Sequence, residues 1–129
     1  MLSLLIVGIG IALTGSESRS TEAGAQGPVD VFVRIPEAIW PVARGEKYED
    51  PIDAALRGAG LGEVTGGGSQ LGPSAPDGTP TIEWVGIDVE LSELERGLPL
   101  LKRELRRIGA PAETAIESRR GGTQVSEGL

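Results

Sequence analysis

The chain has 129 residues and a formal net charge of -7, from 12 basic and 19 acidic side chains. This acidic balance opposes attraction to the phosphate backbones of nucleic acids, which depends on clustered Lys and Arg. Cysteine and histidine are both absent, so disulfides, thiolate nucleophiles, ordinary zinc sites and mechanisms built on Ser-His-Asp or Cys-His are excluded. We therefore expect no nucleic-acid partner, no metal and no cofactor.

The first 28 residues differ in composition from the rest. Residues 1–13 (MLSLLIVGIGIAL) form an uncharged apolar run that is shorter than the roughly 20 residues of a membrane-spanning helix. The run has the length of a secretory signal core, and Ala23-Gly24-Ala25 resembles a cleavage site, although no basic residue precedes the run. These features favour export or membrane tethering through this segment over a cytoplasmic location. The alternatives are a mis-assigned start codon, or an extra strand or helix packed on the domain. Residues 15–28 have the composition of a flexible linker.

A strand is predicted over residues 29–35 (VDVFVRI), where β-branched apolar residues alternate with Asp30, Phe32 and Arg34. A short helix is predicted over residues 50–59, with Asp50 as its N-cap and Pro51 at the first helical position.

The rest of the chain alternates between apolar periodic segments and stretches rich in Gly and Pro. The predicted elements are a brief strand at 62–65, a long loop at 66–80, a strand at 81–91, a helix within 92–108, a strand at 114–118 and a disordered tail at 120–129.

The resulting order is strand, helix, strand, strand, helix, strand, which resembles the ferredoxin-like βαββαβ arrangement. This resemblance implies an α+β domain over residues 29–119, with a four-stranded antiparallel sheet and two helices on one of its faces. Many unrelated functions occur on this fold, so no functional residue is assigned from it.

The open face of such a sheet is the predicted binding surface. Its side chains are expected to be Phe32, Arg34, Trp84, Asp88 and Glu90. Phe32 and Trp84 are expected to lie close together, because the first and third strands are neighbours at the centre of this sheet. Exposed contiguous apolar area usually marks an interface. We therefore predict a non-catalytic module that self-associates, as in a homodimer, or binds a partner protein.

The alternative for the aromatic residues of this face is that another part of the chain buries them. The N-terminal segment, the loop around Trp40 or the C-terminal tail could cover both rings. In RNA-recognition modules of similar fold such aromatic residues stack on bases, but the surrounding charges here are mainly acidic.

An alternative function is the sensing of a small anion or metabolite by Gly66, Gly67 and Gly68 together with Arg44 and Lys47. The glycine run lacks the Lys-Ser/Thr of a phosphate-binding loop and does not lead into a helix. An acylphosphatase-like mechanism on a similar fold uses an asparagine, and the chain contains none.

Catalysis is the least supported hypothesis. Asp88 and Glu90 lie two residues apart on one strand face, where paired carboxylates can transfer protons or bind Ca²⁺ or Mg²⁺. An ion pair with Arg34 on the neighbouring strand is the simpler interpretation. We therefore expect that the protein is not an enzyme.

Overall fold

The computed structural model describes residues 27–129, so the predictions for the N-terminal segment and most of the linker lie outside the described residues. The chain forms one five-stranded sheet of order β3-β4-β2-β5-β6, in which all neighbouring strands are antiparallel. The strands are β2 (Val29–Ile35), β3 (Gly62–Leu71), β4 (Ile82–Leu91), β5 (Ala115–Arg120) and β6 (Thr123–Glu127).

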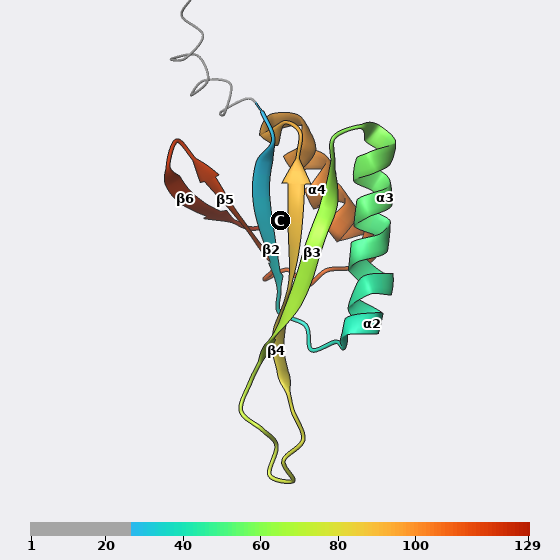
Figure 1. The fold of residues 1–129 in the computed structure, drawn as a ribbon, viewed down its shortest axis with the longest axis vertical. Coiled ribbons are helices and arrows are strands. Elements are labelled where there is room, and N and C mark those ends of the chain that lie inside the picture. Colours follow the sequence, from blue (N-terminus) through green and yellow to red (C-terminus); the bar gives the residue numbers. More distant parts are fainter. Residues whose placement is uncertain (1–26) are drawn as a thin grey trace, which may run out of the picture.

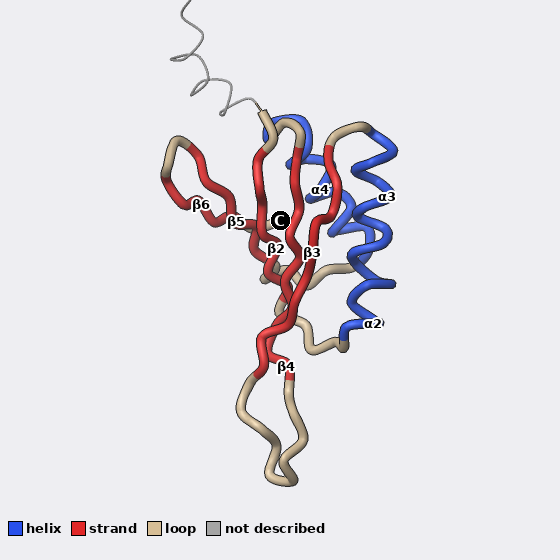
Figure 2. Tube along the Cα trace, viewed as in Figure 1, coloured by secondary structure: helices blue, strands red, loops and turns tan. Residues whose placement is uncertain are grey.

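Two helices lie on one side of this sheet (Figures 1 and 2). The first helix is 19 residues long and consists of three consecutive segments, α2 (Pro41–Arg44), the π-helical turn η1 (Gly45–Glu49) and α3 (Asp50–Ala59). The second helix is α4 (Leu94–Ile108). The α+β class predicted from the sequence therefore fits, whereas the predicted four-stranded ferredoxin-like sheet is wrong, because the sheet has a fifth strand.

The two strands with regular alternation, β2 and β4, are neighbours in the sheet, and the core lies between them and the helices. Val33 of β2 lies opposite Ile87 of β4, and both side chains are fully buried. The remaining inward side chains of these two strands, also buried beneath the helices, are Val31, Ile35, Val85, Val89 and Leu91. The period of two along each strand thus separates a helix-covered face from an open one.

The first helix begins nine residues earlier than the sequence indicated, at Pro41 rather than at Asp50. Asp50 has helical backbone angles and is not an N-cap. The early start is stabilised by buried Tyr48, whose hydroxyl donates to Glu37 Oε1 at 2.5 Å. Lys47 Nζ contacts the other oxygen of Glu37 at 2.7 Å. Burial raises the pKa of Glu37, but these bonds outweigh it and hold that pKa below its usual value.

The fifth strand occupies the segment predicted to be a disordered tail. Gly121 and Gly122 both have positive φ, 60° and 84°, as tight hairpin turns require. The turn folds β6 back along β5. Glu127 of β6 then pairs with Lys102 of α4 and with Arg120 of β5, which ties the added strand to both layers.

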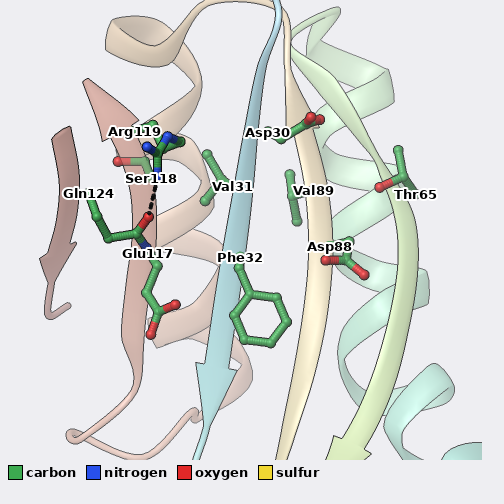
Figure 3. Close-up of a pocket in the computed structure, with 10 residues that line it drawn as sticks. All are labelled: Asp30, Val31, Phe32, Thr65, Asp88, Val89, Glu117, Ser118, Arg119 and Gln124. Atoms are coloured by element: carbon green, nitrogen blue, oxygen red, sulfur yellow. Dashed lines mark hydrogen bonds between the residues drawn. The ribbon is translucent and has the colours of Figure 1, made fainter. Parts of the chain in front are cut away.

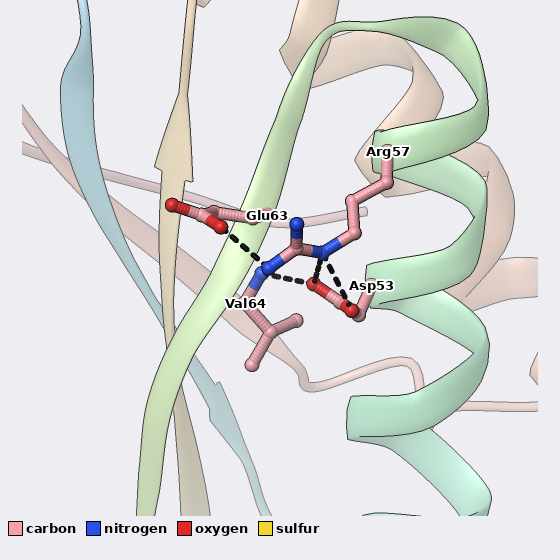
Figure 4. A network of polar contacts seen from close by, with 4 residues as sticks. All are labelled: Asp53, Arg57, Glu63 and Val64. Atoms are coloured by element: carbon pink, nitrogen blue, oxygen red, sulfur yellow. Dashed lines mark hydrogen bonds and ion pairs between the residues drawn. The ribbon is translucent and has the colours of Figure 1, made fainter.

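The outer edge of β3 is capped near one end by the first helix (Figure 4). The backbone N–H of Val64 donates to Asp53 Oδ1 of α3 at 2.9 Å. Arg57 binds both oxygens of Asp53 and also pairs with Glu63 of β3. The bond from Val64 and the contacts with Arg57 hold the pKa of Asp53 below its usual value.

Replacing Asp53 tests this contact through its pH dependence. A folded-state pKa below the unfolded value means that the charged carboxylate contributes stability above about pH 4, and that this contribution disappears as the pH falls through the folded pKa. Asp53→Asn should lower the free energy of unfolding by about 1 kcal/mol at pH 7, and the difference from wild type should shrink below pH 4. Urea denaturation at pH 7 and at pH 3 measures it, with Asp50→Asn on the same helix as the control. An equal loss at both pH values would contradict this role.

Candidate functional site

The five side chains predicted to form the open face lie together on β2 and β4, on the face opposite the buried aliphatic side chains of these two strands. Phe32, Trp84 and Glu90 are half-buried, whereas Arg34 and Asp88 are exposed. Within residues 27–129 no helix covers this face, and β6 extends the sheet instead of folding over it. Trp40, in the loop that could have covered the face, is 55% exposed and precedes α2 on the helix side.

An aromatic pair with a cation stacked on it lies at the centre of the face. The ring centroids of Phe32 and Trp84 are 6.0 Å apart, with an interplanar angle of 83°, which is an edge-to-face contact. The Arg34 guanidinium carbon lies 4.4 Å from the centroid of the Trp84 ring, and Arg34 also pairs with Glu117 of β5 at 3.1 Å. Three strands therefore hold one compact group of four side chains.

Gly86 provides the space in which the Phe32 ring lies. It follows Trp84 by two residues on β4 and faces the same side of the sheet. A Cβ placed on Gly86 would come within 2.2 Å of Phe32 Cζ and 2.6 Å of Cε1. No real side chain tolerates such distances, so the position of the ring requires a glycine here. Sequence reasoning missed this residue, because its role appears only once β2 and β4 are in register.

A shallow pocket of about 400 Å³ extends from Phe32 across the open face (Figure 3). Phe32 and Glu117 lie at one end of its lining, Asp88 lies beside Phe32, and Asp30 lies at the other end (Figure 3). The other lining residues are Val31, Thr65, Val89, Ser118, Arg119 and Gln124. Arg119 donates to Gln124 of β6 at 3.3 Å and closes one side of the pocket. Gln124 was missed because its segment was predicted to be disordered.

The pocket is bordered by carboxylates. Asp30 and Glu90 lie directly opposite each other on β2 and β4, and Glu90 also faces Glu63 on β3. Within residues 27–129, Asp30, Asp88 and Glu90 form no ion pair with a basic side chain. The predicted pairing of Asp88 or Glu90 with Arg34 is therefore wrong, since Arg34 contacts Glu117. No group of three or more potential ligands in the described part of the chain is arranged to hold a metal ion.

The second predicted set of residues does not form a loop. Gly66, Gly67 and Gly68 belong to strand β3 and pair with β4, so the predicted end of this strand at Thr65 is wrong. The long partner strand stabilises an extended backbone that the glycines alone would not favour.

The two cations predicted to bind an anion already have partners within the chain. Arg44 pairs with Glu49 at 2.5 Å and donates to Ser69 Oγ at 3.0 Å. Lys47 pairs with Glu37. Because each positive charge is matched by a carboxylate, this arrangement gives no support to the anion-sensing alternative.

Comparison of the chain with protein-family models, curated proteins and solved structures gives no match. Among residues 27–129 there is no helix with the length and apolar character needed to span a membrane. The site is therefore interpreted from its own geometry, which combines two aromatic rings, a guanidinium that contacts both Trp84 and Glu117, and several carboxylates. They lie on a sheet face that no helix of residues 27–129 covers.

The space above Gly86 can be tested with a single methyl group. Gly86→Ala should force the Phe32 ring to move and lower the free energy of unfolding by about 1–3 kcal/mol. Gly68→Ala is the matched control, because Gly68 lies opposite Gly86 on β3 and has open space around its Cβ position. Chemical denaturation of both variants, with near-UV circular dichroism of the aromatic side chains, measures the difference. Equal stability of the two variants would show that Phe32 does not occupy this space.

Proposed function

We propose that the domain is a non-catalytic interaction module that binds a partner protein or a second copy of itself through the open sheet face. The observation that carries this proposal is the Phe32–Trp84 pair with Arg34 stacked upon it, on a face without helix cover in residues 27–129. Trp and Arg dominate the residues that contribute most to binding at protein interfaces, and such residues lie near the centre of the contact.

The contacts that hold Phe32, Trp84 and Arg34 in place support a role in binding. Arg34 is held between the Trp84 ring and the Glu117 carboxylate, and the Phe32 ring is fixed over Gly86. Side chains that are already ordered lose less conformational entropy when a partner arrives. These side chains are thus preorganised for binding.

The charges around the aromatic pair favour a particular kind of partner. Asp88 lies opposite Phe32, and Asp30 lies opposite Glu90 two residues further along the two strands. None of the three carboxylates has a basic partner within residues 27–129. Opposite charge across an interface accelerates encounter and selects among partners. We therefore expect the protein surface bound here to carry Lys or Arg side chains around an apolar centre.

Replacing the two tryptophans separately tests the proposal. Trp84→Ala should weaken binding at least 30-fold, as the loss of a central aromatic residue costs about 2 kcal/mol or more. Trp40→Ala is the matched control, because Trp40 is exposed on the helix side of the sheet. Proteins retained from a cell extract by the immobilised full chain and by each variant are identified by mass spectrometry. The affinity of each is then measured with the purified partner.

Two results would contradict the proposal. One is a partner that binds Trp84→Ala and wild type equally well. The other is an equal loss of binding in Trp40→Ala, which would place the interface on the helix side.

A further inference from the structure

Strand β3 has an outer edge that is free over part of its length. It is the terminal strand of the sheet and pairs only with β4 among the described strands. The N–H of Gly72 points inward, to the carbonyl of Thr81. Because N–H direction alternates along a strand, the N–H groups of Leu71, Ser69 and Gly67 point outward, away from β4. Such an edge is a template for another strand.

Both ends of this free edge are blocked. At one end Asp53 already binds the outward N–H of Val64, and the next residue, Thr65, lies in a β-bulge. At the other end Pro73 has no N–H. The segment available for pairing is therefore residues 66–72, and its central residue is Ser69.

We propose that a second copy of the chain pairs with this edge, antiparallel and about a two-fold axis at Ser69. In this register Ser69 lies opposite its own copy, Gly68 opposite Gln70, and Gly67 opposite Leu71. Each pair shares one face of the sheet, as antiparallel pairing requires. Outward N–H groups also meet outward carbonyls, because Gly67, Ser69 and Leu71 share the same direction.

The side chains of the segment fit this register. Each residue with a long side chain, Gln70 or Leu71, lies opposite a glycine of the other copy, so the two strands approach without crowding. Gly67, Gly68, Gln70 and Leu71 are exposed, and Leu71 is 56% exposed. The Leu71 carbonyl accepts a bond from the Gln70 side chain at 3.1 Å, and that exposed amide moves aside when a strand binds.

The charge distribution favours a second copy of the chain as the strand that pairs with this edge. Residues 64–76 contain no charged side chain, although the chain as a whole carries a net charge of -7. Most other self-contacts of so acidic a chain bring carboxylates together, whereas antiparallel pairing of residues 66–72 brings none together. The inference does not depend on the proposed function, because the open face takes no part in it.

Single cysteines test the register directly, because the native chain contains none. Ser69→Cys places two sulfhydryls on the two-fold axis, within the Cα separation of about 4.4–6.8 Å that a disulfide needs. The full-length variant should form an intermolecular disulfide under mild oxidation, with at least tenfold more dimer on a non-reducing gel than Ser126→Cys. Ser126 is the matched control, an exposed serine of β6 at the opposite edge of the sheet. Ser74→Cys, outside the pairing segment, should behave like Ser126→Cys.

A second variant tests the hydrogen bonds without a cross-link. Leu71→Pro removes one outward N–H and leaves the bonds from β3 to β4 in place, so it should raise the dissociation constant of the dimer at least tenfold in sedimentation equilibrium. Circular dichroism checks that the variant is folded, and Trp40→Ala, an exposed position outside both the pairing segment and the open face, should leave the dimer unchanged. Three results would overturn the proposal. They are a full chain that is monomeric at all concentrations, equal cross-linking through Ser126→Cys, and a dimer whose dissociation constant Leu71→Pro leaves unchanged.

Discussion

The register between β2 and β4 determines what each face of the sheet presents. Val33 opposite Ile87 and Phe32 opposite Asp88 are consecutive pairs of one antiparallel ladder, so a shift by one residue would exchange the faces. In the observed register all large aliphatic side chains of the two strands point toward the helices. The same register leaves Phe32 and Trp84 outside, beside Gly86. Core formation and the presentation of the aromatic pair therefore follow from one constraint.

Polar contacts supplement this core where the sheet ends. Asp53 caps one edge strand, and Glu127 attaches the other to α4 and β5. These pairs are partly exposed, so each contributes little to overall stability. Their main effect is to fix position, because each holds an edge strand against the layer beside it. The two edges of the sheet thus differ. Strand β6 is attached to the helix layer, whereas β3 is capped over only part of its length.

The sequence was sufficient to predict the features that depend on regular alternation. The strand over residues 29–35 agrees with the structure, and the long strand begins one residue later than predicted, at Ile82. The prediction that Phe32, Arg34, Trp84, Asp88 and Glu90 share one face holds because side-chain direction alternates with a period of two.

The errors lie where partners distant in the sequence decide the structure. Glycines Gly66–Gly68 become a strand only because β4 is long enough to pair with them. The segment from Thr123 forms a strand because the Gly121-Gly122 turn folds it back along β5 and because Glu127 forms ion pairs with Lys102 and Arg120. The first helix begins early because Tyr48 and Lys47 both reach Glu37. The contacts with β4, with Glu37 and with Glu127 leave no pattern in the neighbouring sequence, so composition alone indicated loops and a disordered tail. The Gly121-Gly122 pair is the exception, because two consecutive glycines are a recognised hairpin signal.

The central position of β2 has a consequence for how the chain assembles. This strand is the first of the described strands along the chain, but its two neighbours, β4 and β5, are made much later. Folds with many contacts between distant parts of the sequence fold slowly, because the entropy of closing long loops opposes them before those contacts form. The hairpin of β3 and β4 with α3 contains local contacts and can form first. During synthesis both edges of β2 therefore stay unpaired, and its apolar side chains stay exposed, until β4 and β5 have left the ribosome.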